Sequence, residues 1–450
     1  MKKNLNQEKI INSEKNLMVI ASAGCGKTYT ITKKIDKILK KVSPSEILVI
    51  SFTNETVNDL KKKLHQDIHI KTFHKLAMLV LEKNNSTYYL TSDELLELIT
   101  NDFFENLITK KDKFNLMKYF FIFNYNDLLK SKIFLDFKNV IYTFIKLMHC
   151  NNFNFNFLKT VFKNEKDKFL ISIIMKIYYL YNKEKKDNNL IDLDDLIITA
   201  GECAKKQKFN YKYIFVDEFQ DTSEIRFNLI YNIFRNSNSI INFFGDDFQS
   251  IYAFSGCNLS IMLNIKDKIP DIETLYLDQN FRSDNHLINS ANNFVLKNPY
   301  QLTKKVSSNI TILNSINYIY YKNYKEELFK LINKLELITD DIMFLGRYKN
   351  DFKIIPDKYR KLTIHESKGL EAKFVVILNL KDATNGFPSK IKNHHLLNYF
   401  DNSENFSFAE ERRIFYVAIT RAKEKVFLFI PKVDKSIFIK EFKKIEKMTK

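Results

Sequence analysis

A short apolar run, a turn of small residues and then Lys-Thr restrict the fold of this chain more than any other feature. Residues 17–20 (Leu-Met-Val-Ile) predict a buried strand, residues 21–26 (Ala-Ser-Ala-Gly-Cys-Gly) a tight turn, and Lys27-Thr28 the start of a helix. A glycine-containing turn between strand and helix presents backbone N–H groups to phosphate oxygens. Lys27 would then reach the β- and γ-phosphates of a nucleotide, and Thr28 would bind Mg²⁺. An incidental turn is the alternative, because Ala21 stands where the usual pattern has glycine.

The alternation of strands and helices continues beyond this first unit. Residues 47–50 (Ile-Leu-Val-Ile) predict a second buried strand, followed by a helical pattern that ends near Leu64. Further strands are predicted at 213–216, 240–244, 342–345, 374–378 and 426–429. Successive strand–helix units imply parallel sheets flanked by helices, so the predicted fold class is α/β. Residues 91–195 contain no glycine and repeat Leu, Ile, Phe, Tyr and Lys at helical spacing, which predicts a mostly helical insert.

Carboxylates follow the predicted strand at 213–216. Carboxylates at the end of a buried strand are costly unless they contact cations. In an enzyme that hydrolyses nucleotides, Asp217 would hold Mg²⁺ and Glu218 would orient the attacking water. An acidic strand end that caps the next helix is the structural alternative. Gln249, just past the strand at 240–244, could sense a γ-phosphate.

The composition indicates a polyanionic partner. The 450 residues include 71 Lys+Arg and 53 Asp+Glu, a formal net charge of +18, which favours binding to nucleic acid or an anionic membrane surface. A membrane span is disfavoured because no apolar run reaches about 18 residues, and the first residues lack the apolar stretch of a secretion signal. The four cysteines are scattered, which argues against a disulfide framework, a zinc site or an iron–sulfur cluster. We therefore expect a cytoplasmic, multidomain protein.

Arginine is rare in this lysine-rich chain, so each arginine is a candidate for a specific role. Arg282 and Arg421 are the strongest candidates, because arginines from a neighbouring domain can stabilise charge during phosphoryl transfer. The segment 410–413 could equally be a salt-bridged helix face. Ordinary surface charges are expected for Arg226, Arg235 and Arg360.

Taken in chain order, these segments resemble the motifs of UvrD/Rep-type superfamily 1 DNA helicases. The first helicase motif of that family, A-x-A-G-x-G-K-T, also begins with alanine, which accounts for Ala21. The resemblance covers nearly the whole chain. The matching segments are 5–7, 21–28, 51–54, 72–74, 193–196, 217–221, 245–252, 279–283, 365–371 and 411–422.

The resemblance implies two RecA-like P-loop domains that bind ATP and Mg²⁺ between them, with single-stranded DNA across their top. The first domain would comprise residues 1–90 and 196–278, the helical accessory insert residues 91–195, and the second domain residues 279–450. The implied activity is that of an ATP-dependent DNA helicase or translocase that moves 3′→5′. Two alternatives stay open: a motor subunit that depends on a partner, such as a nuclease in DNA repair or phage defence, and a DNA-binding scaffold with degraded catalysis.

The resemblance also assigns roles to residues of this sequence. The catalytic set would be Lys27, Asp217, Glu218, Gln249, Arg282 and Arg421, with Thr28 and Asp217 as the Mg²⁺ ligands. Gln7 would read the adenine, Phe281 would stack on it, and Glu371 would contact the ribose. The other nucleotide-binding positions would be Ala21, Ser22, Ala23, Gly24, Cys25, Gly26 and Tyr29. The DNA-binding set would be Phe52, Thr53, Asn54, Thr72, Phe73, His74, Tyr252, Phe254 and His365.

Several positions depart from the family pattern. Ser255 stands where the family has an arginine, Glu55 where it has a lysine, and Tyr29 where an arginine is common. Only about 80 residues separate Arg282 from His365, where full-length relatives place a second accessory domain. We therefore expect that domain to be absent or vestigial, which weakens the expectation of processive duplex unwinding more than that of ATP hydrolysis.

Overall fold

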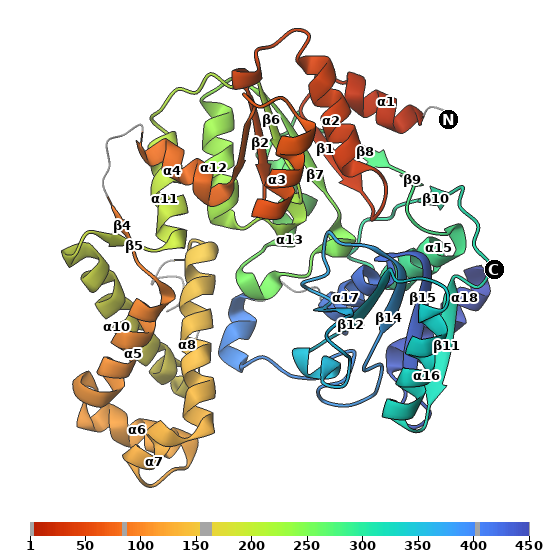
Figure 1. The fold of residues 1–450 in the computed structure, drawn as a ribbon. Helices are drawn as coiled ribbons and strands as arrows, with labels where there is room; N and C mark the ends of the chain where they lie inside the picture. Colours follow the sequence, from red (N-terminus) through yellow and green to blue (C-terminus); the bar gives the residue numbers. More distant parts are fainter. Residues whose placement is uncertain (1–3, 83–87, 154–163, 401–405, 450) are drawn as a thin grey trace.

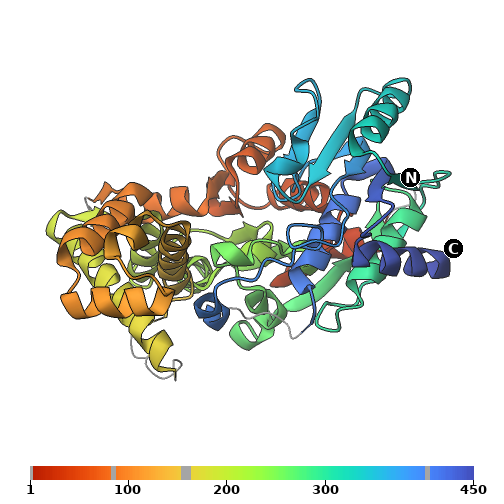
Figure 2. The same cartoon turned by 90° about the horizontal axis from the view of Figure 1, so that it is seen from below.

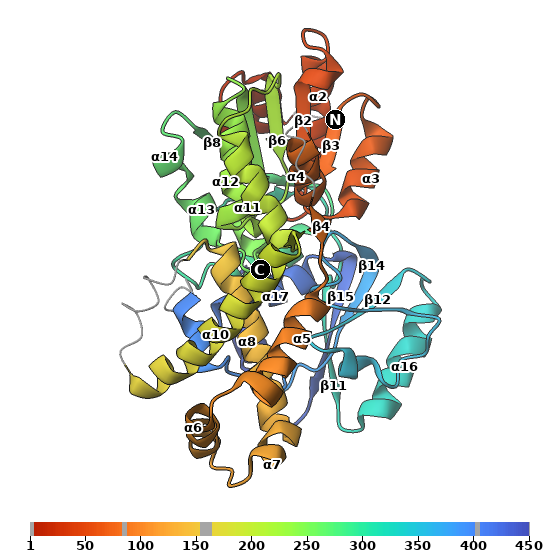
Figure 3. The ribbon, with the colours of Figure 1, turned by 90° about the vertical axis from the view of Figure 1, so that its left-hand side faces the viewer.

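The structure, a computed structural model, describes residues 4–82, 88–153, 164–400 and 406–449 (Figure 1). Within these ranges, two parallel sheets covered by helices lie beside each other, and a helical lobe projects from the first (Figures 1 and 3). Seen from below, the helical lobe occupies one end of the molecule and the second sheet the other (Figure 2). The α/β fold class predicted from the sequence is confirmed.

Six parallel strands in the order β3-β2-β6-β7-β1-β8 form the first sheet. Their bounds are β1 (Leu17–Ala21), β2 (Ile47–Ser51), β3 (His69–Thr72), β6 (Tyr213–Val216), β7 (Ile240–Gly245) and β8 (Glu273–Leu277). One face is covered by α1 (Leu5–Asn12), α2 (Lys27–Ile38) and α3 (Asn54–Lys63), and the other by α4 (Phe73–Glu82), α11 (Leu193–Ala204) and α12 (Glu224–Arg235). Because successive strand residues point to opposite faces, Leu17 and Val19 join the first core while Met18 and Ile20 join the second.

The second sheet has five parallel strands in the order β11-β15-β14-β12-β13. Their bounds are β11 (Ile316–Tyr321), β12 (Ile342–Gly346), β13 (Arg360–Thr363), β14 (Ala372–Ile377) and β15 (Ala422–Pro431). On one face lie α15 (Asn285–Val295), α17 (Ala409–Ile419) and α18 (Ile437–Thr449), and on the other lies α16 (Tyr324–Glu336). Both faces are therefore buried, which explains the near-continuous apolar runs of β12 and β14.

The connection between the two sheets runs from the end of β8 at Leu277 to the start of β11 at Ile316 and includes α15. Before α15 the connection contains β9 (Gln279–Asn280), and after α15 it contains β10 (Ser307–Ser308). These two short strands pair with each other in parallel. The residues between Arg282 and His365 are all described, and their regular elements are α15, β10, β11, α16, β12, the short helix η6 (Lys349–Phe352) and β13. They build the second sheet and its cover, and no further helical domain is inserted in this described stretch.

The helical insert has its own apolar core. Its helices are α5 (Asp93–Asp102), the π-helical turn η2 (Phe103–Leu107), α6 (Lys110–Phe120), α7 (Tyr125–Lys130), α8 (Lys132–Cys150) and α10 (Glu165–Asp187). The insert begins and ends at a pair of two-residue parallel strands, β4 (Tyr89–Leu90) and β5 (Leu190–Ile191). A short helix from the second sheet domain, η7 (His395–Phe400), also packs into this core, against α8.

Every strand predicted from an apolar run is present, with bounds that differ by a few residues. The sequence did not predict β3, β8, β11 and β13. These strands are short or only partly buried, so polar and charged residues interrupt their apolar pattern. In the described part of the chain, no helix is both long enough and apolar enough to cross a membrane.

Candidate nucleotide and nucleic-acid site

The turn after β1 requires glycine at two positions. Gly24 and Gly26 have φ angles of +72° and +74°, which other L residues rarely adopt. A Cβ atom at Gly24 would lie 2.7 Å from Asn280 Nδ2 and from Arg282 Cβ. Gly26 is the N-cap of α2 and makes no side-chain cap hydrogen bond. The turn therefore approaches the 279–283 segment closely and presents the start of α2, the kind of terminus that binds phosphate.

The turn at residues 21–26, the predicted phosphate loop, is held between the two sheet domains. The Ala23 N–H donates to the Tyr416 hydroxyl of α17 (3.4 Å), and the Ala23 carbonyl accepts from Asn280 Nδ2 (2.6 Å). The Ser22 hydroxyl is buried and has no hydrogen-bond partner among the described residues. Burial raises the pKa of the Cys25 thiol, so Cys25 is an inert core residue at neutral pH. An orphaned hydroxyl beside a helix N-terminus fits a loop that binds phosphate oxygens.

Lys27, Asp217 and Glu218 form the charged centre of the site. Lys27 Nζ lies 2.9 Å from Asp217 Oδ1 and also contacts Glu218. Burial lowers the pKa of Lys27, but the two carboxylates outweigh burial and raise the pKa overall. For Glu218, burial raises the pKa, but Lys27 and then Lys368 lower it more strongly, so this carboxylate stays ionised. The two carboxylates supply oxygen ligands of the kind that Mg²⁺ binds, and the ammonium group of Lys27 neutralises them in this structure.

Gln7 and Phe281 both lie close to Gly26. A Cβ atom on Gly26 would be 3.0 Å from Gln7 Nε2 and 3.5 Å from Phe281 Cδ2. Gln7 Nε2 is buried and has no hydrogen-bond partner among the described residues, whereas the Phe281 side chain is 46% exposed. A buried amide donor beside an exposed ring suits an adenine base. Tyr29, one turn into α2, is exposed.

The side chains of Gln249, Arg282 and Arg421 come together near the end of β7, and they belong to both sheet domains. Arg421 is fully buried, and its Nη2 donates to Gln249 Oε1 (3.0 Å), while Gln249 Nε2 donates to Asp246 (2.7 Å). Arg282 Nε donates to Glu371 (2.7 Å), and its Nη1 donates to the Thr420 carbonyl (3.2 Å). Burial, and then repulsion from Arg282, lower the pKa of Arg421 to about 9. Two guanidinium groups that repel each other would both be stabilised by a polyanionic ligand.

Lys368 joins the site although it was absent from the sequence-based set. Its Nζ lies 2.5 Å from Asp221 Oδ2 and 2.7 Å from the Gln249 carbonyl oxygen, across the boundary between the two sheet domains. Burial raises the pKa of Asp221 to about 6 against the lowering effect of Lys368. The sequence held a signal for this lysine, because it lies within the matching segment 365–371. Its partner could not be predicted, since 147 residues separate Lys368 from Asp221.

One aromatic group spans the first and second sheet domains. The exposed ring of Phe254 lies 5.6 Å from His365 and 6.1 Å from Tyr252. The Tyr252 hydroxyl donates to the His365 carbonyl oxygen (3.0 Å). Burial lowers the pKa of His365 to about 4, so this imidazole is neutral at pH 7. A partly exposed, uncharged aromatic surface is suited to stacking with nucleic-acid bases.

The other predicted DNA-binding residues form a second group on the first domain. Phe52 and Phe73 meet edge to face at 5.1 Å. Thr53 caps α3, which begins at Asn54, through a hydrogen bond from the Thr56 N–H. Burial, and then Arg226, lower the pKa of His74. The adjacent Thr72 is buried at the end of β3.

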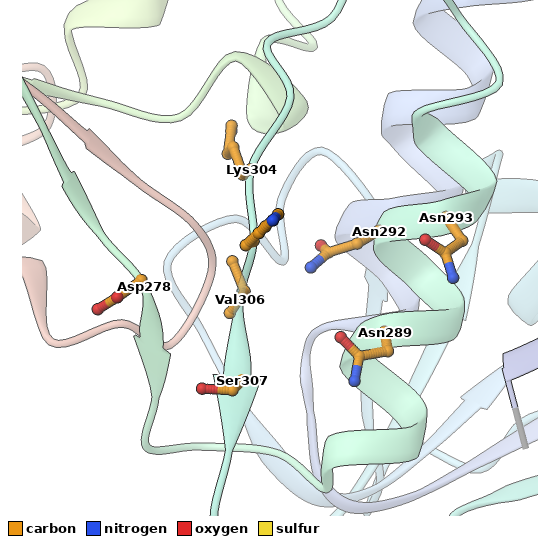
Figure 4. Close-up of a pocket in the computed structure, with 8 residues that line it drawn as sticks. Asp278, Asn289, Asn292, Asn293, Lys304, Val306 and Ser307 are labelled. Carbon is orange, nitrogen blue, oxygen red and sulfur yellow. The ribbon is translucent and has the colours of Figure 1, made fainter.

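A polar cavity of about 360 Å³ lies elsewhere, between α15 and the 304–307 segment (Figure 4). Asn289 and Asn292 reach toward it from α15. Lys304, on the opposite wall, forms an ion pair with Asp247 at 2.5 Å and also contacts Asp246. None of the residues of the predicted nucleotide-binding set lines this cavity.

A cluster in the helical insert has the geometry of a metal site, but the ammonium group of a lysine lies among its carboxylates. His149, Asp192 and Asp195 bring possible ligand atoms within 4.8 Å of one another. Lys185 Nζ lies 2.8 Å from Asp192 Oδ2 and 2.5 Å from Asp195 Oδ2, and Lys185 is buried. The lysine thus supplies the positive charge that the cluster requires, and the cluster ties α10 to α11.

Comparisons with known proteins agree with this geometry. The family model of the UvrD/REP helicase N-terminal domain matches residues 3–270, and that of the UvrD-like helicase C-terminal domain matches residues 322–432. DNA helicase IV of Escherichia coli K12 is 26% identical over 97% of this chain and 69% of its own length.

Two further relatives are matched over a smaller share of their length. ATP-dependent DNA helicase Rep of Buchnera aphidicola subsp. Schizaphis graminum is 28% identical over 72% of this chain and 49% of its own length. ATP-dependent DNA helicase PcrA of Staphylococcus epidermidis is 28% identical over 66% of this chain and 40% of its own length. The chain thus spans about half or less of these two relatives.

Proposed function

The chain belongs to the UvrD/REP helicase family, and we propose that it is a DNA-dependent ATPase that moves 3′→5′ along single-stranded DNA as a helicase or translocase. The proposal extends to a cytoplasmic enzyme whose cofactors are ATP and Mg²⁺. The observation that supports it best is the shared site at the domain boundary. Arg421 and Lys368 of the second domain bond to Gln249 and Asp221 of the first.

In the proposed mechanism, each side chain positions or neutralises a part of the nucleotide. Lys27 and the loop N–H groups would hold the β- and γ-phosphates, and Thr28 and Asp217 would hold Mg²⁺, which neutralises phosphate charge when bound. Ionised Glu218 would orient the attacking water and accept its proton.

The γ-phosphate would complete the contact between the two domains. Gln249, Arg282 and Arg421 would surround it and stabilise the charge that develops on its oxygens during transfer. Since these groups come from both sheet domains, hydrolysis would change how tightly the domains contact each other. This dependence is what a motor requires.

The first experiment is steady-state ATP hydrolysis with and without an oligo-dT single strand. We expect strong stimulation by the strand, and a loss of about 10²–10⁴-fold in Glu218→Gln because that variant lacks the general base. Glu14→Gln, on an exposed carboxylate, is the matched control. A low rate that the strand does not change, together with tight DNA binding, would favour a scaffold. Duplexes with a 3′ or a 5′ tail then test the polarity.

A motor subunit that depends on a partner is the second candidate. It is favoured by the short stretch between Arg282 and His365, all of which builds the second sheet domain and its cover. Strand displacement separates the two candidates. ATPase activity that responds to DNA without displacement by the isolated chain, and with displacement once a co-purified protein such as a nuclease is added, would establish the dependent subunit.

A further inference from the structure

Arg226 lies beside the predicted DNA-binding residues although it belongs to no motif of the sequence-based set. It is in the first turns of α12, and its guanidinium carbon lies 5.4 Å from the centre of the Phe52 ring. Its charge contributes to the lowered pKa of His74. Because His74 is therefore neutral at pH 7, Arg226 is the cation of this group.

The guanidinium group is only lightly engaged. Its one hydrogen bond among the described residues is from Nη1 to the Asp221 carbonyl oxygen, at 3.4 Å. By contrast, Arg282, Arg347, Arg360 and Arg412 each form an ion pair with a carboxylate. Within the described part of the chain, Arg226 has no such pair. A half-buried guanidinium stacked on a ring, with most of its donors unused, is prepared for an anionic ligand.

The same carbonyl oxygen connects Arg226 to the loop that carries Phe254. The Cys257 thiol also donates to the Asp221 carbonyl (2.9 Å), and the Ser255 hydroxyl lies 3.5 Å from Cys257 Sγ. Arg226 therefore lies between the Phe52–Phe73 group and the Phe254 loop. A strand that stacks a base on the exposed Phe254 ring and continues toward the partly buried Phe52 would bring its backbone past this guanidinium.

We propose that Arg226 binds a phosphodiester of the single strand between these two aromatic groups. The inference rests on the proposed function, since it adds a phosphate contact to the same nucleic-acid path. Arginine offers two parallel N–H donors to a phosphate, which a lysine cannot reproduce. The positive charge of Arg226 therefore has a fixed position on the proposed path of the single strand, unlike the many lysines spread over the surface.

The test compares Arg226→Ala, Arg226→Lys and Arg235→Ala in oligo-dT binding by fluorescence anisotropy over a range of salt concentrations. Arg235 is exposed at the other end of α12, so its variant removes the same charge from the same helix. We expect Arg226→Ala to raise the dissociation constant about 10-fold and to reduce the slope of log K against log salt by about 1. Arg226→Lys should retain the slope but recover only part of the affinity. Arg235→Ala should match the wild type.

The outcomes separate this inference from the proposed function. A wild-type protein whose ATPase responds to oligo-dT, with Arg226→Ala and Arg226→Lys both binding like the wild type, overturns the role of Arg226 and leaves the motor intact. A wild-type protein that neither binds nor responds to oligo-dT overturns both. Circular dichroism shows whether Arg226→Ala folds, and if it does not, Arg226→Lys is the deciding variant. A loss of affinity for oligo-dT at an unchanged salt slope supports phosphate binding by the two parallel N–H donors of arginine. An unchanged affinity refutes it.

Discussion

Two of the contacts that the second sheet domain makes with the rest of the molecule differ in their chemistry. The first, which we name the nucleotide contact, consists of the pairs Arg421–Gln249, Lys368–Asp221 and Arg413–Ser250. Each of these links is a hydrogen bond or an ion pair, and the side chains are buried or nearly so. Desolvation offsets most of the attraction in buried polar pairs, so they add little net stability but depend strongly on geometry.

The second, the η7 contact, is apolar. It consists of Leu396 and Phe400, which enter the core of the helical insert beside α8. The Phe400 ring lies 4.7 Å from that of Phe144 and 5.7 Å from that of Phe153. At the rim of this contact, His395 forms a hydrogen bond with Asp167 at 2.8 Å. Burial of such side chains contributes about 1.5–3 kcal/mol each.

Because one contact is polar and the other apolar, we expect the two contacts to have different roles. A polar contact can exchange its partners when a phosphate binds, whereas an apolar contact keeps its stability in every nucleotide state. We therefore expect the η7 contact to hold the second sheet domain on the insert while the nucleotide contact opens and closes.

The largest expected effect is at the nucleotide contact. Arg421→Ala should lower ATP turnover about 10³-fold or more, because the variant removes the buried guanidinium expected to stabilise charge during phosphoryl transfer. Steady-state hydrolysis at saturating ATP and oligo-dT measures this change. A loss below about 10-fold would mean that Arg421 serves only the packing of the two domains.

The next effect is at the η7 contact and should appear in stability instead of turnover. Leu396→Ala should cost about 2–5 kcal/mol in the free energy of unfolding, because it leaves a cavity in the core of the insert. Urea unfolding followed by circular dichroism measures the cost, and Ile391→Ala, at an exposed position, is the control. If Leu396→Ala were as stable as the control, the η7 contact would not hold the domains together.

A third prediction concerns pH at the nucleotide contact. Since burial raises the pKa of Asp221 to about 6, lowering the pH through 6 protonates this carboxyl and weakens its ion pair with Lys368. ATP turnover should therefore fall about 10-fold between pH 7.5 and pH 5. His365 stays neutral over this range, because its pKa is about 4. In Asp221→Asn the acid limb should vanish from the pH profile, and a limb that persists would belong to another group.

The sequence predicted the strands and the turn that carry these contacts, but it did not predict which residues contact each other. The apolar runs at 47–50 and 374–378 predicted the buried strands that the structure places at Ile47–Ser51 and Ala372–Ile377. Both faces of each strand are covered, so the apolar run is not broken by a regular alternation with polar residues. The strand, turn and helix start at residues 17–28 were predictable because the whole pattern lies within consecutive residues, and phosphate binding by the turn stays a prediction. The strand Glu273–Leu277, at the sheet edge, was missed because its burial alternates.

Contacts between distant segments could not be predicted in this way. The apolar residues of His395–Phe400 give no sign of what they pack against, and Leu396 and Phe400 are buried because α8 provides a core some 250 residues earlier in the chain. Arg226 was expected to be a surface charge for the same reason: nothing near it in the sequence shows that Phe52 lies beneath it. Local patterns indicate which face of an element is buried, but they do not identify the partner.

The smallest expected effect tests whether the η7 contact is held by its apolar centre. His395 is about half exposed, and its Nε2 donates a hydrogen bond to Asp167 Oδ1 at 2.8 Å. A pair with an exposed imidazole contributes about 0.2–1 kcal/mol, since water competes for that partner. The buried carboxylate of Asp167 needs a donor, which a glutamine at position 395 can supply. His395→Gln, which retains hydrogen-bonding capacity but loses the ring, should therefore lower the free energy of unfolding by less than about 1 kcal/mol in the urea experiment. A loss as large as that of Leu396→Ala would show that the rim holds the helix in place, and the η7 contact would then be polar in its energetics, like the nucleotide contact.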